Sequence, residues 1–474
     1  MPLRADRRMA KQTPRAGLGI ALLLLAGGCS MAPRYERPEP PVPAAFPAAD
    51  YAGVPTLGYR TLFTDQRLQQ LIALALENNR DLRQAAANIE RARAQYRIQR
   101  ASLFPQVDAG ADLSRQEGGQ GADGTSASAD VSITAYEIDL FGRLRAQSEA
   151  ARNSFLASES TAQAVRLTLI GDIAQAWLGY AADVSRRDLA SRTAEAAQRS
   201  VTLTDARLRG GVAPRTDLRQ AQTILATAQS DVARYTTAIA QDRNLLSLLA
   251  GTPVDDALLP GPIEQVADLI AAPSADLSSE VLLRRPDIMA AEYDLRAANA
   301  QIGAARAALF PRITLGALFG VVGTSLEALF GDRGEQSWQV GGSAVYPIFS
   351  GGAARAGVAE SKAQRDALLA AYEKAIQTGY REVADALARQ DTMQDQVAAD
   401  RLRVEASEDA YRLADARYRG GVDSFLQALD AQRSLYSAQG TLVATLLEAA
   451  TNRVTLYRAL GGEAAAGEGG EAAR

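Results

Sequence analysis

Apolar and polar positions follow the period of a packed helix over most of the chain. Between residues 422 and 460, apolar or aromatic residues recur at every seventh position: Leu429, Tyr436, Val443, Ala450 and Tyr457. Heptads of this kind are typical of helices that lie side by side in a coiled coil. Residues 143–208 and 352–418 contain no proline and are rich in alanine, arginine, glutamine, glutamate and leucine. We therefore predict very long helices over these ranges.

Two segments change to a period of two, which predicts a β-hairpin in each. After Pro105, apolar residues alternate with polar or small ones, and the alternation returns at 129–135. After Pro311 the same pattern begins again, and it returns from Trp338 onward. We place the hairpins at about 104–140 and about 310–349. Strands of roughly ten residues with one apolar face are typical of membrane β-barrels.

The chain contains an internal duplication. The segment Asp-Ala-Arg-x-Arg-Gly-Gly-Val occurs at 205–212 and again at 415–422, and further matches follow at the same offset of 210 residues. Each half is predicted to contain a helix, a hairpin, a long helix, a tight turn and a second long helix. The predicted fold class is therefore mainly α with a membrane β-barrel, built from a duplicated repeat.

The N-terminus has the pattern of a secretory signal peptide. Residues 4–15 carry five basic residues and one acidic residue, and residues 17–28 are apolar or small. Twelve helical residues span ~18 Å, which is too short for the ~30 Å hydrocarbon core of a bilayer. The run ends in Ala-Gly-Gly before Cys29, which resembles a bacterial lipobox. We expect cleavage before Cys29 and a covalent lipid on its sulfur; the alternative is an ordinary signal peptide with an incidental cysteine.

These patterns divide the chain into six parts. In chain order we predict a lipoprotein signal peptide at 1–28, a lipidated proline-rich tether at 29–62, the first structural repeat at 63–252, an equatorial linker segment at 253–285, the second structural repeat at 286–462 and a flexible tail at 463–474.

Composition excludes several functional classes. The formal net charge is −4, which argues against nucleic acid as a partner. The chain has no histidine and one cysteine, which removes histidine-based catalytic triads, nearly all zinc sites and any intramolecular disulfide. We therefore expect no enzyme, no metal and no cofactor apart from the lipid on Cys29.

The predicted strands also constrain the assembly. Four strands from one chain leave two open edges, and open edges cannot lie in hydrocarbon. We therefore expect several chains to close the barrel: two copies would give eight strands and three would give twelve. The predicted mature chain has no run of 18 apolar residues, so no helical route through a membrane is expected.

Several segments resemble the TolC-like outer membrane efflux channels, in particular their OprM-like lipoprotein branch. The resemblance is carried by the tether after Cys29, by Tyr136–Arg143 with tyrosine where the family usually has tryptophan, by Arg285–Ile288 and by the repeated Arg-x-Arg-Gly-Gly-Val turn. It implies a homotrimer in the outer membrane, with a shared twelve-stranded barrel and a helical tunnel extending into the periplasm. It also implies a periplasmic adaptor (membrane fusion) protein and a proton-driven inner-membrane transporter as partners.

The resemblance assigns candidate sites to both turns. The residues matching a periplasmic gate are Leu426, Asp430, Asp217 and Tyr418. The residues matching adaptor-contact tips are Arg207, Arg209, Gly210, Gly211, Val212, Arg417, Arg419, Gly420, Gly421 and Val422. The alternatives are that the paired glycines only terminate helices and that Asp217 only caps one. Asp423 stands where some relatives carry a basic residue, so we expect no salt-bridged latch there.

Two functional hypotheses of different classes follow. The first is a passive exit duct for drugs or other small solutes in a tripartite efflux system. The second is a lipid-anchored periplasmic coiled-coil scaffold that never crosses the membrane. The hairpins favour the channel, because a scaffold needs no strands with an apolar face. A TolC-like channel serving protein or metal export also remains open, since the sequence does not identify the exported substrate.

Overall fold

The computed structural model describes residues 30–46, 58–116, 124–273, 278–330 and 334–462. The predicted signal peptide, Cys29 and the C-terminal tail lie outside these residues. The described chain forms two compact units: one includes residues 90–156 and 293–370, and the other includes 157–292 and 371–462. The structural division therefore differs from the sequence repeats, because each repeat contributes to both units.

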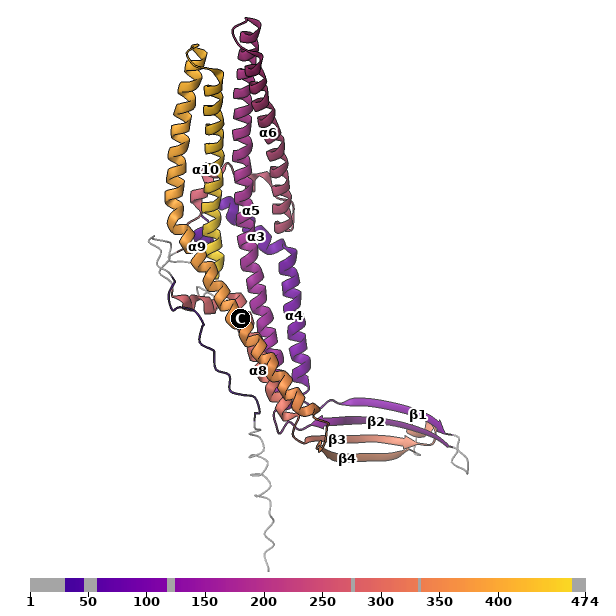
Figure 1. Cartoon of the computed structure of the whole chain (residues 1–474). Helices are drawn as coiled ribbons and strands as arrows, with labels where there is room; N and C mark the ends of the chain where they lie inside the picture. The colour runs from indigo at the N-terminus through magenta and orange to yellow at the C-terminus, as the bar shows by residue number, and fades with distance from the viewer. Residues whose placement is uncertain (1–29, 47–57, 117–123, 274–277, 331–333, 463–474) are drawn as a thin grey trace, which may run out of the picture. The chain divides into compact units, whose positions relative to one another are not determined.

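Four strands form one antiparallel sheet in the first unit (Figure 1). They are β1 (Asp108–Gln116), β2 (Gly124–Glu137), β3 (Arg312–Gly323) and β4 (Glu335–Val345). Their order is β1-β2-β3-β4, so the two hairpins are neighbours and β2 pairs with β3. Within the described residues, β1 pairs only with β2 and β4 only with β3, so both outer edges are open.

The strand register separates an apolar face from a polar one. One cross-strand row consists of Ala109, Val131, Phe319 and Trp338. The adjacent row, on the opposite face because side chains alternate, consists of Gly110, Asp130, Gly320 and Ser337. The large apolar side chains of the first row are exposed in the single chain, with Trp338 at 76%. The predicted period of two is therefore confirmed.

A β-bulge that the sequence pattern did not predict interrupts β2. The register shifts between Ile133 and Tyr136, and Ala135 has a φ of 56°. A non-glycine residue with positive φ is uncommon and is typical of such irregular positions. The regular alternation that we predicted through Ala135 is therefore wrong at that residue, because the extra residue breaks the ladder there.

The helices reproduce the predicted duplication. The longest are α5 (Arg143–Arg209) and α9 (Ala353–Arg419), each of 67 residues. Each is followed after a short turn by a second helix, α6 (Arg215–Ala250) or α10 (Phe425–Ala459). Each hairpin is preceded by a helix of 22 residues, α4 (Arg80–Ala101) or α8 (Pro286–Ala307). In the described part of the chain, no helix has both the length and the apolar character that a bilayer crossing needs.

Shorter elements complete the second unit. They are α2 (Tyr59–Leu62), α3 (Gln66–Asn78), α7 (Ile263–Val266) and the 3₁₀ turns η1 (Asp256–Leu258), η2 (Ala267–Leu269) and η3 (Ser279–Arg284); the first unit has η4 (Glu327–Phe330). Asp65 caps α3 by accepting a hydrogen bond from the backbone N–H of Arg67. Gly251 ends α6 with a φ of 71°, and a Cβ there would lie 2.3 Å from the backbone oxygen of Asn78. Only glycine fits that position.

The main core of the second unit lies between α3, α5, α6 and α10. Trp177 is fully buried and donates its indole N–H to the carbonyl of Leu258, 3.0 Å away. Four of the five predicted heptad positions in α10 are buried, including Val443 and Tyr457. The fifth, Tyr436, is half-buried and donates its hydroxyl to Asp231 on α6 at 2.7 Å. The heptad pattern therefore correctly identified the packed face of α10.

Candidate functional site

The two Gly-Gly-Val turns have the same backbone conformation. Gly211 and Gly421 have φ values of 77° and 74°, the left-handed region that glycine adopts without a steric penalty. The N–H of Val212 donates to the carbonyl of Arg207 at 3.0 Å, and Val422 donates to Arg417 at 2.9 Å. These bonds are those of a Schellman helix end. The paired glycines therefore terminate helices, which is common to both of our interpretations of these turns.

The side chains of the two turns behave differently, although the backbones match. Arg207 reaches from α5 to the end of α9 and donates to the carbonyls of Tyr418 and Arg419, at 3.2 and 3.0 Å. Its guanidinium carbon also lies 4.5 Å from the centroid of the Tyr418 ring. Arg417, the repeat equivalent of Arg207, instead forms a two-bond ion pair with Asp423 in its own turn, at 2.5 and 2.9 Å.

One residue explains this difference. The first turn carries Ala213 where the second carries Asp423. Without a local carboxylate, Arg207 binds the carbonyl oxygens at the C-terminus of α9, where the helix dipole favours a cation. Asp423 does form a salt bridge, but its partner is Arg417 in the same turn, because the chain reverses there and brings them together. This local pair does not test our expectation that no salt-bridged latch forms at Asp423.

Tyr418 lies in the core of the tip rather than on its surface. It is 6% exposed and packs with Phe425, Ala428, Leu429 and Ala221. Its ring centroid is 5.2 Å from that of Phe425. Its buried hydroxyl has no hydrogen-bond partner among the described residues. Tyr418 is therefore buried, whereas the predicted gate residues Leu426 and Asp430 are exposed.

Leu426 and Asp430 are both exposed on the first turns of α10. They lie four residues apart, so they share one helix face. Leu426 is 52% exposed, which is high for a leucine within a coiled coil. An apolar side chain and a carboxylate therefore lie side by side on a face that the single chain leaves uncovered.

Asp217 does not cap α6. The N-cap residue is Pro214, with no side-chain capping bond, and Asp217 lies three residues later in the first turn. The capping alternative is therefore wrong, although a carboxylate in the first turn still interacts favourably with the helix dipole. Asp217 is half-buried, and none of its side-chain oxygens accepts a hydrogen bond from the described residues.

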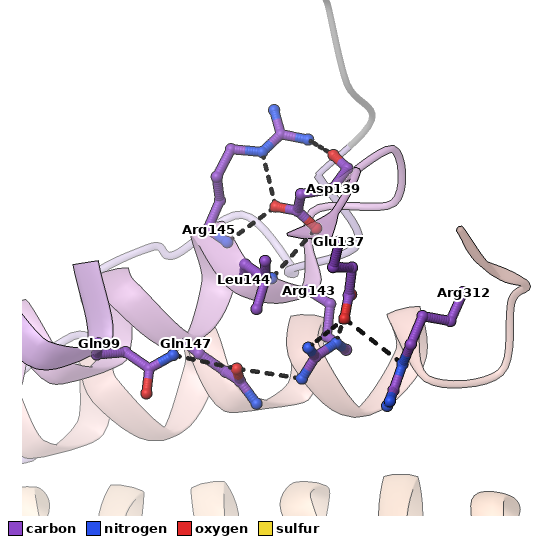
Figure 2. A network of polar contacts seen from close by, with 8 residues as sticks. All are labelled: Gln99, Glu137, Asp139, Arg143, Leu144, Arg145, Gln147 and Arg312. Atoms are coloured by element: carbon purple, nitrogen blue, oxygen red, sulfur yellow. Dashed lines mark hydrogen bonds and ion pairs between the residues drawn. The ribbon is translucent and has the colours of Figure 1, made fainter. Parts of the chain in front are cut away.

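A polar network joins the sheet to α5 in the first unit (Figure 2). Asp139 accepts bonds from the backbone N–H groups of Leu144 and Arg145, at 3.2 and 2.9 Å, and so caps the helix. Glu137, at the end of β2, forms a two-bond ion pair with Arg143 at 2.8 and 2.6 Å. Arg312, at the start of β3, lies 3.5 Å from the same carboxylate. The network fixes α5 to both central strands.

In the sequence analysis, residues 136–143 carried part of the family resemblance, but their roles in capping α5 and in pairing with the strands were not predicted. The spacing itself carried a signal, because Asp139 lies four residues before Arg143, where the helical pattern begins, and an acid near a helix start is a capping candidate. The partner on β3 could not be found this way, because Arg312 is far away in the sequence.

The described part of the tether is docked on α8. Asn299 donates to the carbonyl of Pro33 at 2.8 Å, and Arg306 donates to that of Met31 at 3.2 Å. A Cβ at Gly303 would lie 2.7 Å from the Cβ of Ala32, so the close approach requires glycine. These α8 residues follow one another at helical spacing, and they form a track for an extended chain.

Arg285, from the matching Arg-Pro-Asp segment, is buried in the second unit. It forms two hydrogen bonds to Asp287, one to Glu382 at 3.0 Å and one to the carbonyl of Ala459 at 2.7 Å. Burial alone would raise the pKa of Asp287, but the hydrogen bonds and charge of Arg285 lower it below its usual range. Arg285 therefore joins the start of α8 to the middle of α9 and to the end of α10.

Within the described residues, no group of acidic or cysteine side chains could hold a metal ion. The predicted sites thus form a pair of structured tips, one exposed apolar and acidic patch on α10, and a tether track on α8.

Comparisons with known proteins agree with this architecture. A family model described as "Outer membrane efflux protein" matches residues 71–252 and 277–462. The chain is 42% identical over 461 residues to the "Probable efflux pump outer membrane protein TtgC" of Pseudomonas putida, covering 94% of each. It is 39% identical over 462 residues to the "Outer membrane protein OprJ" of Pseudomonas aeruginosa, covering 94% of this chain and 96% of that protein.

A solved structure gives the same result. The open state of the MtrE outer membrane channel of Neisseria gonorrhoeae matches with a TM-score of 0.84 and 36% identity, covering 92% of this chain and 98% of that one. The predicted fold class, the outer-membrane location and the role in efflux are confirmed by these matches. The chain belongs to the outer membrane efflux protein family.

Proposed function

We propose that three copies of the chain close their sheets into one twelve-stranded barrel. The observation that supports this most directly is the four-stranded sheet with two open edges and one exposed apolar face. Open edges carry unpaired backbone groups that hydrocarbon cannot satisfy, so they need strands from other copies. The apolar row with Phe319 and Trp338 would face lipid, and the row with Asp130 and Ser337 would face the lumen.

The assembled channel acts as a passive exit duct and carries out no catalysis. Relatives are named for toluene, solvent and antibiotic efflux, all in Pseudomonas putida. We propose the same classes of substrate here: organic solvents and antibiotics. The scaffold alternative loses its support, because the relatives are channel components of efflux pumps and the sheet is present. Proteins or metal ions are the second candidate for the exported substrate; this alternative changes the substrate and leaves the proposed channel the same.

Leu426 and Asp430 form the gate in this proposal. Both are exposed on one face of α10 in the single chain. Around a threefold axis, three leucines would form an apolar constriction that resists wetting. Three aspartates one turn away would form an acidic ring that attracts cations. Tyr418 and Asp217 are supporting residues in the tip, since neither lies on that exposed face with Leu426.

The partners follow from the role in an efflux system. The tips with Arg209, Val212, Arg419 and Val422 contact a periplasmic adaptor, and an inner-membrane transporter driven by protons supplies the solute. Val212 and Val422 are 77% and 66% exposed, which leaves apolar surface at both turns for such a contact. A lipid on Cys29 anchors the N-terminus, and the tether track on α8 holds the segment that follows it.

The mass of the purified protein tests the assembly. Native mass spectrometry in a mild detergent should give the mass of three chains, because only three copies provide twelve strands. A stable monomer or dimer would contradict the trimer.

Membrane insertion tests which face of the sheet meets lipid. The Phe319→Asp variant places a charge on the proposed lipid face without altering the strand edges. It should reduce membrane insertion, whereas Ser337→Asp on the opposite face should not.

Labelling with palmitate tests the lipid separately. The Cys29→Ser variant should lose all label, since Cys29 is the only cysteine in the chain. Label that persists in this variant would contradict the lipobox assignment but would not contradict the proposed channel function.

A further inference from the structure

A pocket at the tip carries two positive charges that the described residues do not neutralise. Its volume is about 330 Å³, and it lies between α5, α9 and α10. Four ionisable charged residues line it: Arg199, Arg207, Asp415 and Arg419. Asp415 is paired with Arg419 at 2.8 Å, so that carboxylate is already used. Arg199 and Arg207 are left over.

Neither remaining arginine has a carboxylate partner within the described residues. Arg207 donates only to the neutral carbonyls of Tyr418 and Arg419. Arg199 makes no hydrogen bond or ion pair with any described residue. Arg207 is half-buried and Arg199 is exposed. A partly shielded guanidinium binds a carboxylate more strongly than an isolated surface arginine does, because less water screens it.

Two tyrosines form the other side of the pocket, and one of them has an unused hydroxyl. Tyr418 is 6% exposed, lines the pocket and has a buried oxygen without a hydrogen-bond partner among the described residues. A buried hydroxyl that stays unpaired costs free energy. Burial, and then the charge of Asp415, raise the pKa of Tyr411, so this hydroxyl keeps its proton and can also donate.

The equivalent position in the other repeat cannot form the same site. At the offset of 210 residues, Arg199 corresponds to Asp409 and Tyr418 corresponds to Leu208. The first exchange reverses the charge, and the second removes the hydroxyl. Asp409 is moreover paired with Arg412 on its own helix. The pocket chemistry is therefore specific to one of the two tips.

We propose that this pocket receives a carboxylate side chain, an aspartate or glutamate, of the periplasmic protein that meets the tips. The carboxylate accepts hydrogen bonds from the guanidinium groups and from the Tyr411 hydroxyl. We choose an acidic group because the residues that line the pocket have a net positive charge. The partner is the one that the proposed function requires, so the inference rests on that proposal.

Binding of a short fluorescent oligoglutamate peptide to the full-length protein in detergent tests the site itself. We expect saturable, salt-sensitive binding, and no binding of the matched oligoglutamine peptide. Arg199→Gln should weaken binding about fivefold, the effect of one partly exposed ion pair. Tyr411→Phe keeps the ring and should weaken binding about threefold, the effect of one hydrogen bond.

Arg192→Gln is the control variant. Arg192 is an exposed arginine on the same helix that does not line the pocket, so the variant removes the same charge elsewhere. It should leave binding unchanged. Equal weakening in all three variants, or no binding to the parent protein, would overturn the inference. Absence of binding to the parent protein is also the result expected if a carboxylate of a neighbouring copy already fills the pocket.

A cellular measurement connects the site to the pump. Arg199→Gln should lower antibiotic efflux while its single-channel conductance equals that of the parent. Unchanged efflux together with lost peptide binding would overturn the role in partner recognition. A parent protein without any conductance would instead contradict the proposed duct, so the two failures are distinguishable.

Discussion

The two tips of the molecule have nearly identical sequences and different side-chain contacts. Both turns have the same glycine conformation and the same helix-ending hydrogen bonds. Arg417 pairs with Asp423 inside its turn, whereas Arg207 crosses to the carbonyls of the other turn. The two turns differ at two positions that bear on these contacts: Ala213 replaces Asp423, the partner of Arg417, and Leu208 replaces Tyr418, whose ring Arg207 contacts. Internal repeats therefore preserve backbone geometry more strictly than they preserve contacts.

The difference also divides the roles of the two turns. The second turn is held by its own ion pair, in which the Arg417 side chain is exposed and that of Asp423 is half-buried, so solvent still reaches the pair. Exposed pairs contribute little to stability. The contact between the turns depends instead on Arg207 and on the buried ring of Tyr418. We therefore expect variants at the crossing contact to have larger effects than variants at the local pair.

The largest effect is expected from Tyr418→Ala. This variant empties the small apolar cluster with Phe425 and Leu429 and should cost about 3 kcal/mol of local stability. Leu208→Ala, at the equivalent and only half-buried position, should cost about 1 kcal/mol. Hydrogen exchange of the amides around both turns measures this, because it reports local opening. Equal effects would contradict the asymmetry of the tips.

Arg207→Gln should come next, at about 2 kcal/mol. It removes two hydrogen bonds to helix-end carbonyls and the contact with the Tyr418 ring. Its matched control is Arg417→Gln, which removes the same charge from the equivalent position. Exchange of the amides at the end of α9 should accelerate in the first variant and remain near the parent rate in the second.

Gly421→Ala should cost about 1 kcal/mol, since alanine adopts a φ of 74° only with strain. Gly420→Ala, one residue earlier, should be nearly neutral, because the backbone there has no positive φ and an added Cβ meets only ordinary contacts. The same pair of substitutions at Gly211 and Gly210 should give the same two values. A clear difference between the repeats would show that the turns are not equivalent in backbone.

The smallest effect is a pH dependence at Asp423. Its pKa is held below the usual 3.8 by the hydrogen bond and charge of Arg417. A lowered folded-state pKa stabilises the fold above the unfolded value, and this contribution disappears as the pH falls through the folded value. Protection of the Val422 amide should therefore exceed that of the Asp423→Asn variant at neutral pH. The two should converge well below pH 3.8, whereas a constant gap would contradict the ion pair.

Local patterns predicted much of this fold. The heptad spacing found the packed face of α10, the proline-free ranges found α5 and α9 to within a few residues, and period-two alternation found both hairpins. These features depend on neighbours in the sequence. The bulge at Ala135 did not appear in the pattern, because it depends on how β2 must bend against β3.

Site chemistry was less accessible from the sequence. Asp423 and Arg417 are six residues apart, but only the closed turn shows that they meet. The burial of Tyr418 depends on Phe425 and on an arginine 211 residues away. The docking of Ala32 against Gly303 likewise joins distant segments. Such contacts require the three-dimensional arrangement, and a single sequence without aligned relatives contains no direct signal of them.

Single-channel conductance in a planar bilayer tests the central claim, that copies of this chain form a gated duct. The parent protein should conduct, and Leu426→Ala combined with Asp430→Ala should raise the conductance and weaken block by divalent cations, because an apolar and an acidic ring are removed together. Leu429→Ala, at a buried position beside them, is the control and should leave cation block unchanged. A parent protein that does not conduct, or a double variant with the same conductance and the same block, would contradict the account.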